Sequence, residues 1–220
     1  MWANIRQSLP EAVTTNQDFA NFLDKQIINA EEEWHSGLES SARPLIDAAR
    51  HRDISFYQND SDCIFFLQFL SVQHFRTSGI KSRTLEAFKY RSNIDLSRCW
   101  NVLSHILATN LGSSLFLDRK RIPLVLLENR TDVPFITSDQ PTINLLSNSQ
   151  TSEGPEHLAL YYPISPTLAL LLDDPDKSCG LSSESLSSER VIGLNVTRAA
   201  KSFRQVFGNT KDVLLLLLPP

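Results

Sequence analysis

The stretch SDCIFFLQFLSVQHF, residues 61–75, decides the fold, because apolar side chains cover nearly the whole circumference of the helix it can form. Its fifteen residues contain no glycine or proline, which favours one helix over a pair of buried strands. Ser61 or Asp62 can cap its N-terminus, and Gly79 stands where helices often stop. A helix that is apolar on all sides is buried, so we expect this segment to be a central helix.

Helical patterns dominate the chain from Asn16, a candidate N-cap, to about Leu117. Pro44 is expected to start a new helix, because proline fits the first turn but not the interior of a helix. Gly112 is expected to end the last helix of this half. Besides the central helix, the predicted helices are residues 16–38, 43–52, 83–92 and 95–111.

After Phe116 the pattern changes to short apolar runs bounded by proline, aspartate, asparagine and glycine, which is typical of strands. One helix, from about Glu189 to Phe207, interrupts these runs. Helices followed by strands indicate an α+β fold, in which an N-terminal helical half (about 16–117) packs on a small, mostly antiparallel C-terminal sheet with one late helix (about 118–220). We expect a single domain over residues 1–220. The predicted strands are residues 124–127, 135–137, 158–162, 167–172 and 213–218.

Composition excludes several classes of protein. The chain has 220 residues, 41% hydrophobic and 21% charged, as in soluble globular proteins. Its net charge of -4 lacks the basic footprint of nucleic-acid binding. Three widely spaced cysteines, Cys63, Cys99 and Cys179, argue against a disulfide framework or a zinc site. The N-terminus has no signal-peptide core, and the longest aliphatic run, Val213–Leu218, is too short to cross a bilayer. We therefore expect a cytoplasmic protein without a membrane partner.

Polar side chains continue an apolar face at the end of the central helix. Gln73, Arg76 and Thr77 lie within about 100° of one another on a helical wheel, on the face that carries Phe66 and Phe69. A guanidinium in such a place needs a carboxylate, a cluster of carbonyls or an anionic ligand. A structural ion pair and an anion-binding role are both open for Arg76.

A second polar group follows the strand predicted at residues 135–137, where the chain breaks into Ser138, Asp139 and Gln140. Asp139 is the obvious partner of Arg76 and could serve as a general base or metal ligand. The alternative is a turn, in which Ser138 or Asp139 accepts hydrogen bonds from the amides that follow. No second carboxylate accompanies Asp139, so we assign no metal site.

Four motifs occur in order along the chain: Gln73-His-Phe-Arg-Thr77, Pro134-Phe-Ile-Thr-Ser-Asp-Gln-Pro141, Tyr162-Pro-Ile-Ser-Pro166 and Gly193-Leu-Asn195. This succession resembles the large microbial family of unknown function numbered 4238. There a Gln-x-x-Arg-Thr helix end, a Ser-Asp-Asn-Pro turn and a Pro-Leu-Ser-Pro strand recur in this order. The resemblance covers roughly residues 18 to 210 and implies no established activity.

The chain departs from the family pattern at two places. Gln140 stands where the family mostly has asparagine. The family's usual His-Tyr-Val-Pro-like segment is not found before the first long helix, which would leave any site that depends on that histidine incomplete.

Two further groups of residues have weaker interpretations. Arg98 and His105 lie seven residues apart on one predicted helix, which resembles the Arg-x(4–6)-His pattern of HEPN-type ribonucleases. The alternative is a packed or surface histidine on a core helix. Arg198, Lys201 and Arg204 form a basic stripe on the last helix, and we expect it to be a solvated face.

Two functions follow from these residues. The first is a polar cleft between the two halves that binds an anionic nucleotide or phosphodiester and could hydrolyse it, with no cofactor specified. Arg76 and Asp139 would then be catalytic. The second is a non-enzymatic interaction module with a protein partner, in which the same residues form an internal ion-pair network. In the first hypothesis the ligand-binding residues are Gln73, Thr77, Ser138 and Gln140.

Overall fold

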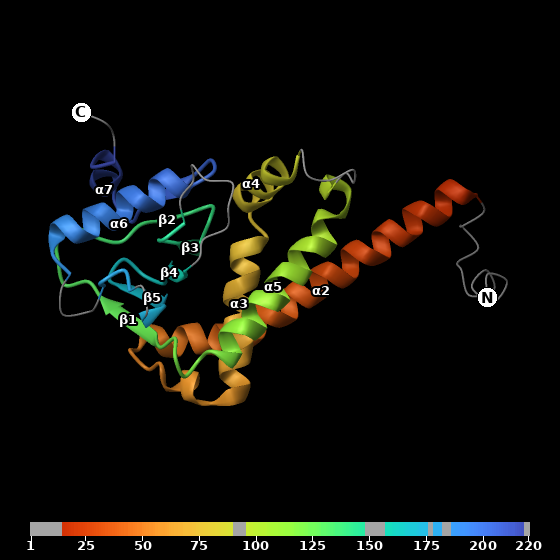
Figure 1. The fold of residues 1–220 in the computed structure, drawn as a ribbon. Helices are drawn as coiled ribbons and strands as arrows, with labels where there is room; N and C mark the ends of the chain where they lie inside the picture. The colour runs from red at the N-terminus through yellow and green to blue at the C-terminus, as the bar shows by residue number, and fades with distance from the viewer. Residues whose placement is uncertain (1–14, 90–95, 148–156, 176–177, 182–185, 218–220) are drawn as a thin grey trace. The chain divides into compact units, whose positions relative to one another are not determined.

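The computed structural model describes residues 15–89, 96–147, 157–175, 178–181 and 186–217 (Figure 1). The chain divides into two compact units, residues 1–41 and 42–220. The fold is α+β, with helices in the N-terminal half and an antiparallel sheet with a late helix in the C-terminal half, as the sequence predicted. Within the described ranges, no helix combines the length and the apolar character needed to cross a membrane.

The first unit contains the start of α2 (Asn16–Arg50), which Thr15 caps. The Thr15 hydroxyl accepts a hydrogen bond from the amide of Asp18 at 3.0 Å, and the Asp18 carboxylate accepts from the amide of Thr15 at 2.9 Å. This reciprocal pair is a capping box. It places the N-cap one residue before the predicted Asn16.

Helix α2 runs through Pro44 without a break, so the prediction of a new helix at this proline is wrong. An interior proline costs about 3 kcal/mol of helix stability. Burial of an apolar face that continues past the proline can offset this cost. The buried residues of this face that lie in the second unit are Ala42, Leu45, Ile46 and Ala49.

Two helices of the second unit, α3 (Asp60–Phe75) and α5 (Trp100–Leu117), pack side by side (Figure 1). A Cβ on Gly112 would lie 3.2 Å from the Cα of Gln68, so this glycine allows the two backbones to approach closely. It lies inside α5, and its prediction as a helix stop is wrong. Helix α3 is the predicted central helix, although Ile64 and Phe65 on one side of it are exposed.

The short helix η1 (Ser55–Gln58) precedes α3, and η2 (Leu96–Cys99) precedes α5. Between the two long helices lies α4 (Ser78–Phe88), which begins one turn earlier than predicted. Its N-cap is Thr77, whose hydroxyl accepts a hydrogen bond from the amide of Ile80 at 3.4 Å. Gly79 therefore follows the end of α3 at Phe75, as predicted, and also lies in the first turn of α4.

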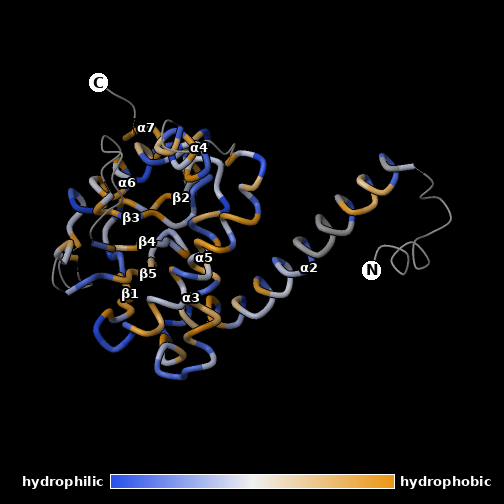
Figure 2. The backbone as a smooth tube through the Cα atoms, turned by 45° about the vertical axis from the view of Figure 1, so that its right-hand side comes forward, coloured by the Kyte–Doolittle hydropathy of each residue, from blue (hydrophilic) through white to orange (hydrophobic). Residues whose placement is uncertain are grey.

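The main sheet has four antiparallel strands in the order β1 (Leu124–Glu128), β5 (Leu168–Asp173), β4 (Ala159–Pro163) and β3 (Ile143–Asn144). Every residue of β5 is buried. A strand that is covered on both faces reads as a continuous apolar run, and β1 and β5 show this as orange stretches in Figure 2. The mostly antiparallel sheet of the sequence prediction is confirmed.

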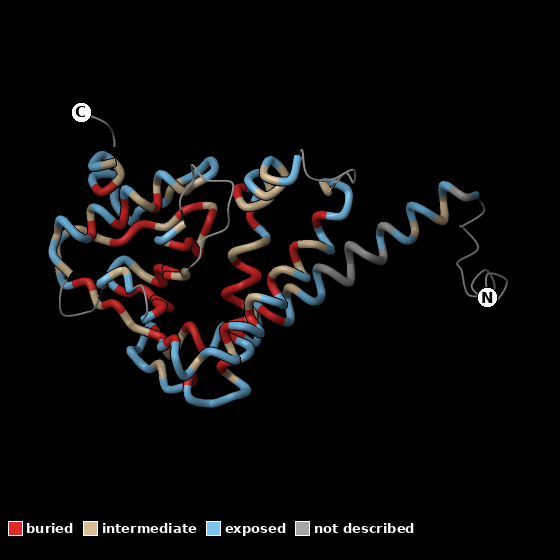
Figure 3. Tube along the Cα trace, viewed as in Figure 1, coloured by how far each residue is buried: buried red, intermediate tan, exposed pale blue. Residues whose placement is uncertain are grey.

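Neighbouring residues of β4 contact helices on opposite faces of the sheet. The ring of Tyr162 meets Phe69 of α3, with 6.2 Å between centroids. The ring of Tyr161 faces the guanidinium of Arg198 of α6 (Ser188–Lys201), with 5.1 Å from Cζ to the ring centroid. Because side chains alternate along a strand, the sheet forms a middle layer between α3 and α6. Figure 3 shows the buried residues in red along α3 and the central strands.

The end of the chain differs from its prediction. Helix α6 ends at Lys201, and the following residues form β6 (Val206–Phe207), which pairs with β2 (Thr137–Ser138). A strand was predicted at residues 213–218, but residues 211–215 form α7 (Lys211–Leu215). Thr210 caps this helix and Val213 is its buried residue. An aliphatic run without polar residues has no period that distinguishes helix from strand.

Candidate anion-binding site

Asp139 lies just after β2, where its carboxylate binds the main chain that follows α6. The carboxylate accepts hydrogen bonds from the amides of Phe203 at 3.0 Å, Arg204 at 2.6 Å and Gln205 at 3.3 Å. The Asp139 amide donates to the Gln205 carbonyl at 3.1 Å. The three amides belong to residues 203–205 and not to the turn that follows Asp139, so this arrangement differs from the turn-type alternative. It attaches the end of β2 to the segment that leads into β6.

Arg76 is exposed at the C-cap of α3. Among the ion pairs between described residues, none joins Arg76 to Asp139. The structure therefore places the two candidate catalytic residues in separate settings, one on the surface and one in a main-chain clamp.

Gln140, the next residue after this clamp, is the centre of a different cluster. Its side chain is only 1% exposed. Oε1 of Gln140 accepts a hydrogen bond from Nη2 of Arg83 at 2.8 Å, and a Cβ added to Gly79 would lie 2.0 Å from its Nε2. Gly79 and Arg83 are one helical turn apart, so a single face of α4 receives the Gln140 amide.

The other predicted ligand-binding residues surround this position. The hydroxyl of Ser138 donates to the Gln140 carbonyl at 3.1 Å and accepts from the Gln140 amide at 3.2 Å. Thr77 is buried, and its hydroxyl donates to the carbonyl of His74 at 3.1 Å. Gln73 is buried in the last turn of α3. Ser138 and Thr77 thus order the turn and the start of α4 that meet at Gln140.

Arg198 of α6 is fully buried and is held by carbonyl groups. Its Nη1 donates to the carbonyls of Gln140 at 2.7 Å and Pro141 at 3.1 Å, and its Nη2 donates to that of Tyr161 at 3.1 Å. Burial lowers the pKa of Arg198 to about 10, although the neighbouring tyrosines act to raise it. The expectation that this residue belongs to a solvated basic stripe is wrong, because the helix turns it towards the sheet.

Lys201, one turn further along α6, is also held by a loop. Its Nζ donates to the carbonyl of Ser147 at 2.5 Å and to the Ser147 hydroxyl at 2.7 Å. Burial and the charge of Arg83 both lower the pKa of Lys201. Burial also lowers the pKa of Arg83. Two cations from different helices therefore lie close enough to repel each other.

His74 joins the same group from the end of α3. Its Nδ1 lies 3.1 Å from the carbonyl oxygen of Thr142. Burial lowers the pKa of His74, and the charges of Arg83 and Lys201 lower it further, although the hydrogen bond to Thr142 acts to raise it. We call these five residues the Gln140 cluster: His74, Arg83, Gln140, Arg198 and Lys201.

The Gln140 cluster carries positive charge, and no carboxylate of a described residue pairs with it. Within the described residues, no ion pair includes Arg83, Arg198 or Lys201. Four buried side-chain atoms of the cluster and its neighbours also lack a hydrogen-bond partner in the part of the chain that the structure describes. They are Nε2 of Gln140, Oγ1 of Thr142, Oη of Tyr161 and Nε of Arg198.

Sequence reasoning identified Gln140 but missed the other four members of the cluster as site residues. The pattern Gly79-x-x-x-Arg83 indicated one such residue. A glycine one turn before an arginine leaves space on the same helix face for a side chain that the arginine can bind. The basic spacing of Arg198 and Lys201 was also visible. No local pattern shows that α4 and α6 meet the same turn.

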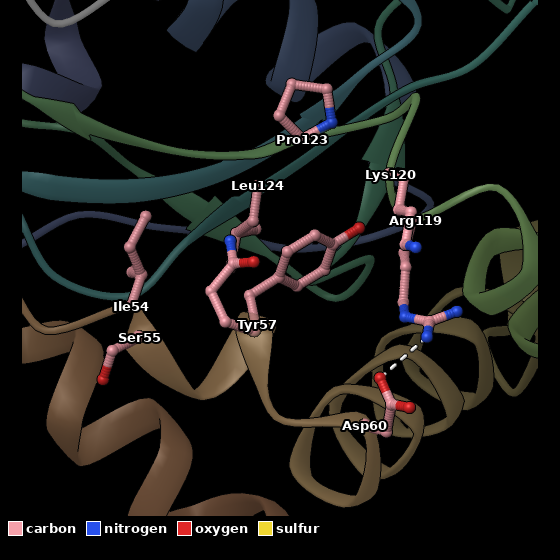
Figure 4. Close-up of a pocket in the computed structure, with 9 residues that line it drawn as sticks. Ile54, Ser55, Tyr57, Asp60, Arg119, Lys120, Pro123 and Leu124 are labelled. Atoms are coloured by element: carbon pink, nitrogen blue, oxygen red, sulfur yellow. Dashed lines mark hydrogen bonds and ion pairs between the residues drawn. The ribbon is translucent and has the colours of Figure 1, made fainter.

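Two cavities lie elsewhere in the second unit. One, of about 560 Å³, is lined by Tyr57, Lys120 and the ion pair between Arg119 and Asp60 at 2.7 Å, with other residues of η1 and the start of β1 (Figure 4). The other, of about 490 Å³, lies between the loop at residues 131–134 and α7. In the first cavity the Arg119 guanidinium already has a carboxylate, which distinguishes it from the Gln140 cluster.

Arg98 and His105, the two residues of the ribonuclease-like pattern, lie in different helices and differ in exposure. Arg98 is exposed in η2, whereas His105 is half-buried in α5. They were expected on one continuous helix, but the α-helix begins only at Trp100.

Within the described residues, no group of three or more histidine, cysteine, aspartate or glutamate side chains is placed to hold a metal ion. All three cysteines are free thiols. Burial raises the pKa of Cys63 and of Cys179 to about 11, so neither is a thiolate at neutral pH.

The motifs that suggested the family meet in the structure. The side-chain oxygen of Asn195 accepts from the amide of Ile136 at 3.2 Å, and its Nδ2 donates to the carbonyl of Pro134 at 2.9 Å. The amide of Phe135 donates to the carbonyl of Pro166 at 2.8 Å. The second, third and fourth motifs thus join α6, the segment before β2 and the β4–β5 turn.

Together these observations define an α+β protein with a cationic cluster around the turn at Gln140, in which Arg198 of α6 is buried, Lys201 is half-buried and Arg83 of α4 is exposed. The chain belongs to the family described as Protein of unknown function (DUF4238), which matches residues 4–212. No curated protein and no solved structure matches the chain.

Proposed function

We propose that the unit formed by residues 42–220 binds an anionic ligand of the phosphate type at the Gln140 cluster. One observation carries the proposal: Arg83 and Arg198 bind Gln140, Lys201 lies one turn from Arg198 on α6, and none of the three has a carboxylate partner among the described residues. Arg198 is fully buried, whereas Lys201 is half-buried and Arg83 is exposed. Desolvating a charge without a counter-charge costs several kcal/mol. An anion that binds here would supply the missing negative charge.

The hydrogen-bonding groups support the same ligand class. Nε2 of Gln140 is a buried donor without a partner among the described residues, and the guanidinium of Arg83 uses one of its five N–H groups for Gln140. Arginine, lysine and amide donors around one point match the several acceptor oxygens of a phosphate.

The alternative is an interaction module in which these residues are only an internal network. It accounts for Arg198 and Asp139, whose hydrogen bonds are made to the main chain. It does not account for the mutual repulsion of Arg83 and Lys201 or for the unpartnered Gln140 amide. We therefore place the anion beside Arg83 and Lys201, and assign Arg198 and Asp139 to holding the surrounding chain.

The proposal includes a cytoplasmic location, which the three free thiols support. It includes a bacterial source as well, which rests on the resemblance to a microbial family alone. It also includes a nucleotide or phosphodiester as the molecule that carries the phosphate. Hydrolysis of that ester would be the enzymatic form of the function. Asp139 is poorly suited to be its base, because three amides already bind the carboxylate.

Isothermal titration calorimetry of the full chain with inorganic phosphate, pyrophosphate and a nucleoside monophosphate tests the proposal. At least one of these anions is expected to bind. Arg83→Gln should weaken that binding about tenfold to a hundredfold, the usual effect of losing a charged hydrogen bond. Arg130→Gln is the matched control, since Arg130 is an exposed arginine paired with Glu128 at 3.4 Å. Absence of binding by all three anions would refute the proposal.

A further inference from the structure

The cavity of about 560 Å³ between η1 and the start of β1 lies within the second unit, and none of the residues that line it belongs to the Gln140 cluster (Figure 4). Its volume is in the range of about 300–1,000 Å³ that is usual for small-molecule sites. Such sites combine an apolar lining with a few polar groups that orient the ligand. This cavity has both kinds of lining.

The apolar part of the cavity is formed by Ile54, Tyr57, Pro123 and Leu124. The hydroxyl of Tyr57 donates a hydrogen bond to the carbonyl of Ile122 at 2.8 Å, so its donor is already used. Tyr57 therefore lines the cavity with an aromatic ring, to which the other three residues add aliphatic surface. A ligand that fits here buries an apolar body, and a flat ring suits the face of Tyr57.

The polar part of the cavity has a net positive charge. Nη2 of Arg119 donates to Oδ1 of Asp60 at 2.7 Å, and Nη1 donates to the carbonyl of Phe116 at 2.8 Å. The charge of Arg119 is thus balanced by that of Asp60. Lys120 also lines the cavity, is exposed, and forms no ion pair with a described residue. A single positive charge therefore remains without a counter-charge at this end.

A neutral donor accompanies this charge. The side-chain amide of Gln58 lines the cavity and has no hydrogen-bond partner among the described residues. An ammonium group and an amide N–H together match the acceptor oxygens of one carboxylate. A doubly charged phosphate is less suited, because the carboxylate of Asp60 would repel its second charge.

We propose that this cavity binds an aromatic monocarboxylate. The carboxylate lies at Lys120 and Gln58, and the aromatic ring lies against Tyr57 and Leu124. The inference concerns a site separate from the Gln140 cluster and does not rest on the proposed function, so either can fail without the other.

The test is an NMR titration of the full chain with 2-naphthoate and, separately, with its neutral analogue 2-naphthamide. The backbone amide signals of Ile54, Tyr57 and Leu124 are expected to shift with both compounds. We expect 2-naphthoate to bind about threefold to fivefold tighter, the usual effect of one exposed charge pair. The inference is overturned if 2-naphthoate leaves these three signals unchanged, or if the two compounds bind equally well.

Lys120→Met removes the charge and keeps most of the side-chain stem. It should weaken 2-naphthoate alone and bring the ratio of the two affinities close to one, because 2-naphthamide has no charge to lose. Since Lys120 is exposed, the variant is expected to fold. Lys211→Met, at an exposed lysine of α7 that does not line the cavity, is the matched control and should keep the wild-type ratio. A wild-type ratio in Lys120→Met would overturn the inference.

Discussion

Arg83 donates a hydrogen bond to the side chain of Gln140 at 2.8 Å, although the two residues lie 57 positions apart in the sequence. Gly79, one turn before Arg83, leaves the space in which the Gln140 amide lies against α4. The candidate site therefore depends on a helix–turn contact that only a residue without Cβ permits. This contact also sets the position of the Gln140 backbone carbonyl, to which Arg198 of α6 donates a hydrogen bond.

Gly79→Ala should disrupt this contact. Its Cβ would lie 2.0 Å from Nε2 and 2.7 Å from the side-chain carbonyl carbon of Gln140, so the buried amide must move and lose Arg83. We expect a loss of about 1–3 kcal/mol in the free energy of unfolding, measured by urea denaturation. Gly193→Ala is the control, because its Cβ meets nothing within 4 Å on α6 and should stabilise the protein by up to about 1 kcal/mol. Equal effects of the two substitutions would contradict the close approach.

Asp139→Asn tests whether the carboxylate orders the chain or serves the ligand. It replaces a charged acceptor of three amides by a neutral one, so unfolding should become easier by about 2 kcal/mol. Phosphate affinity should change less than about threefold, since the anion is assigned to Arg83 and Lys201. Asp132→Asn, at an exposed aspartate, should change stability by less than about 0.5 kcal/mol. Lost phosphate binding at unchanged stability would instead assign Asp139 to the ligand.

Arg198→Met should be among the most destabilising single changes in the second unit. The methionine fills part of the space but leaves the carbonyls of Gln140, Pro141 and Tyr161 without their donor. A loss of about 3 kcal/mol or more is expected in denaturant titrations. Arg190→Met on the same helix removes one exposed hydrogen bond, to the Cys179 carbonyl, and should cost less than about 1 kcal/mol. A more stable Arg198→Met protein would show that burying the charge costs more free energy than its hydrogen bonds to the three carbonyls contribute.

The sequence predicted those features that depend on neighbours along the chain. The apolar run of residues 61–75 and the strand β5 were identified because burial on all sides leaves an unbroken apolar pattern. The motifs identified the family because their order survives in the chain. Features set by distant partners were missed: β3 and β6 have only two residues each, and their pairing residues lie far away in sequence.

The same limit explains the errors at individual residues. Gly112 was interpreted as a helix stop, but it lies inside α5, where an added Cβ would meet Gln68 of α3. The pairing of Arg76 with Asp139 followed from charge alone, and the structure gives Asp139 to three amides instead. Arg198 was predicted to lie on a solvated face, because the sequence of α6 does not show that this helix packs on the turn at Gln140 and Pro141.

The lowered pKa of His74 predicts a loss of stability in mild acid. The unfolded chain takes up a proton near the ordinary histidine pKa of about 6.5, whereas the folded protein takes it up only at a lower pH. The unfolded state therefore binds more protons in this interval, and the free energy of unfolding falls as the pH drops from about 6.5 to the folded pKa, by at most about 1.4 kcal/mol per pH unit. Urea unfolding between about pH 7.5 and pH 4.5 measures the slope. His74→Phe should remove this step and His51→Phe should keep it. An identical pH profile in wild-type protein and His74→Phe would mean that His74 is not enclosed by the cations of α4 and α6.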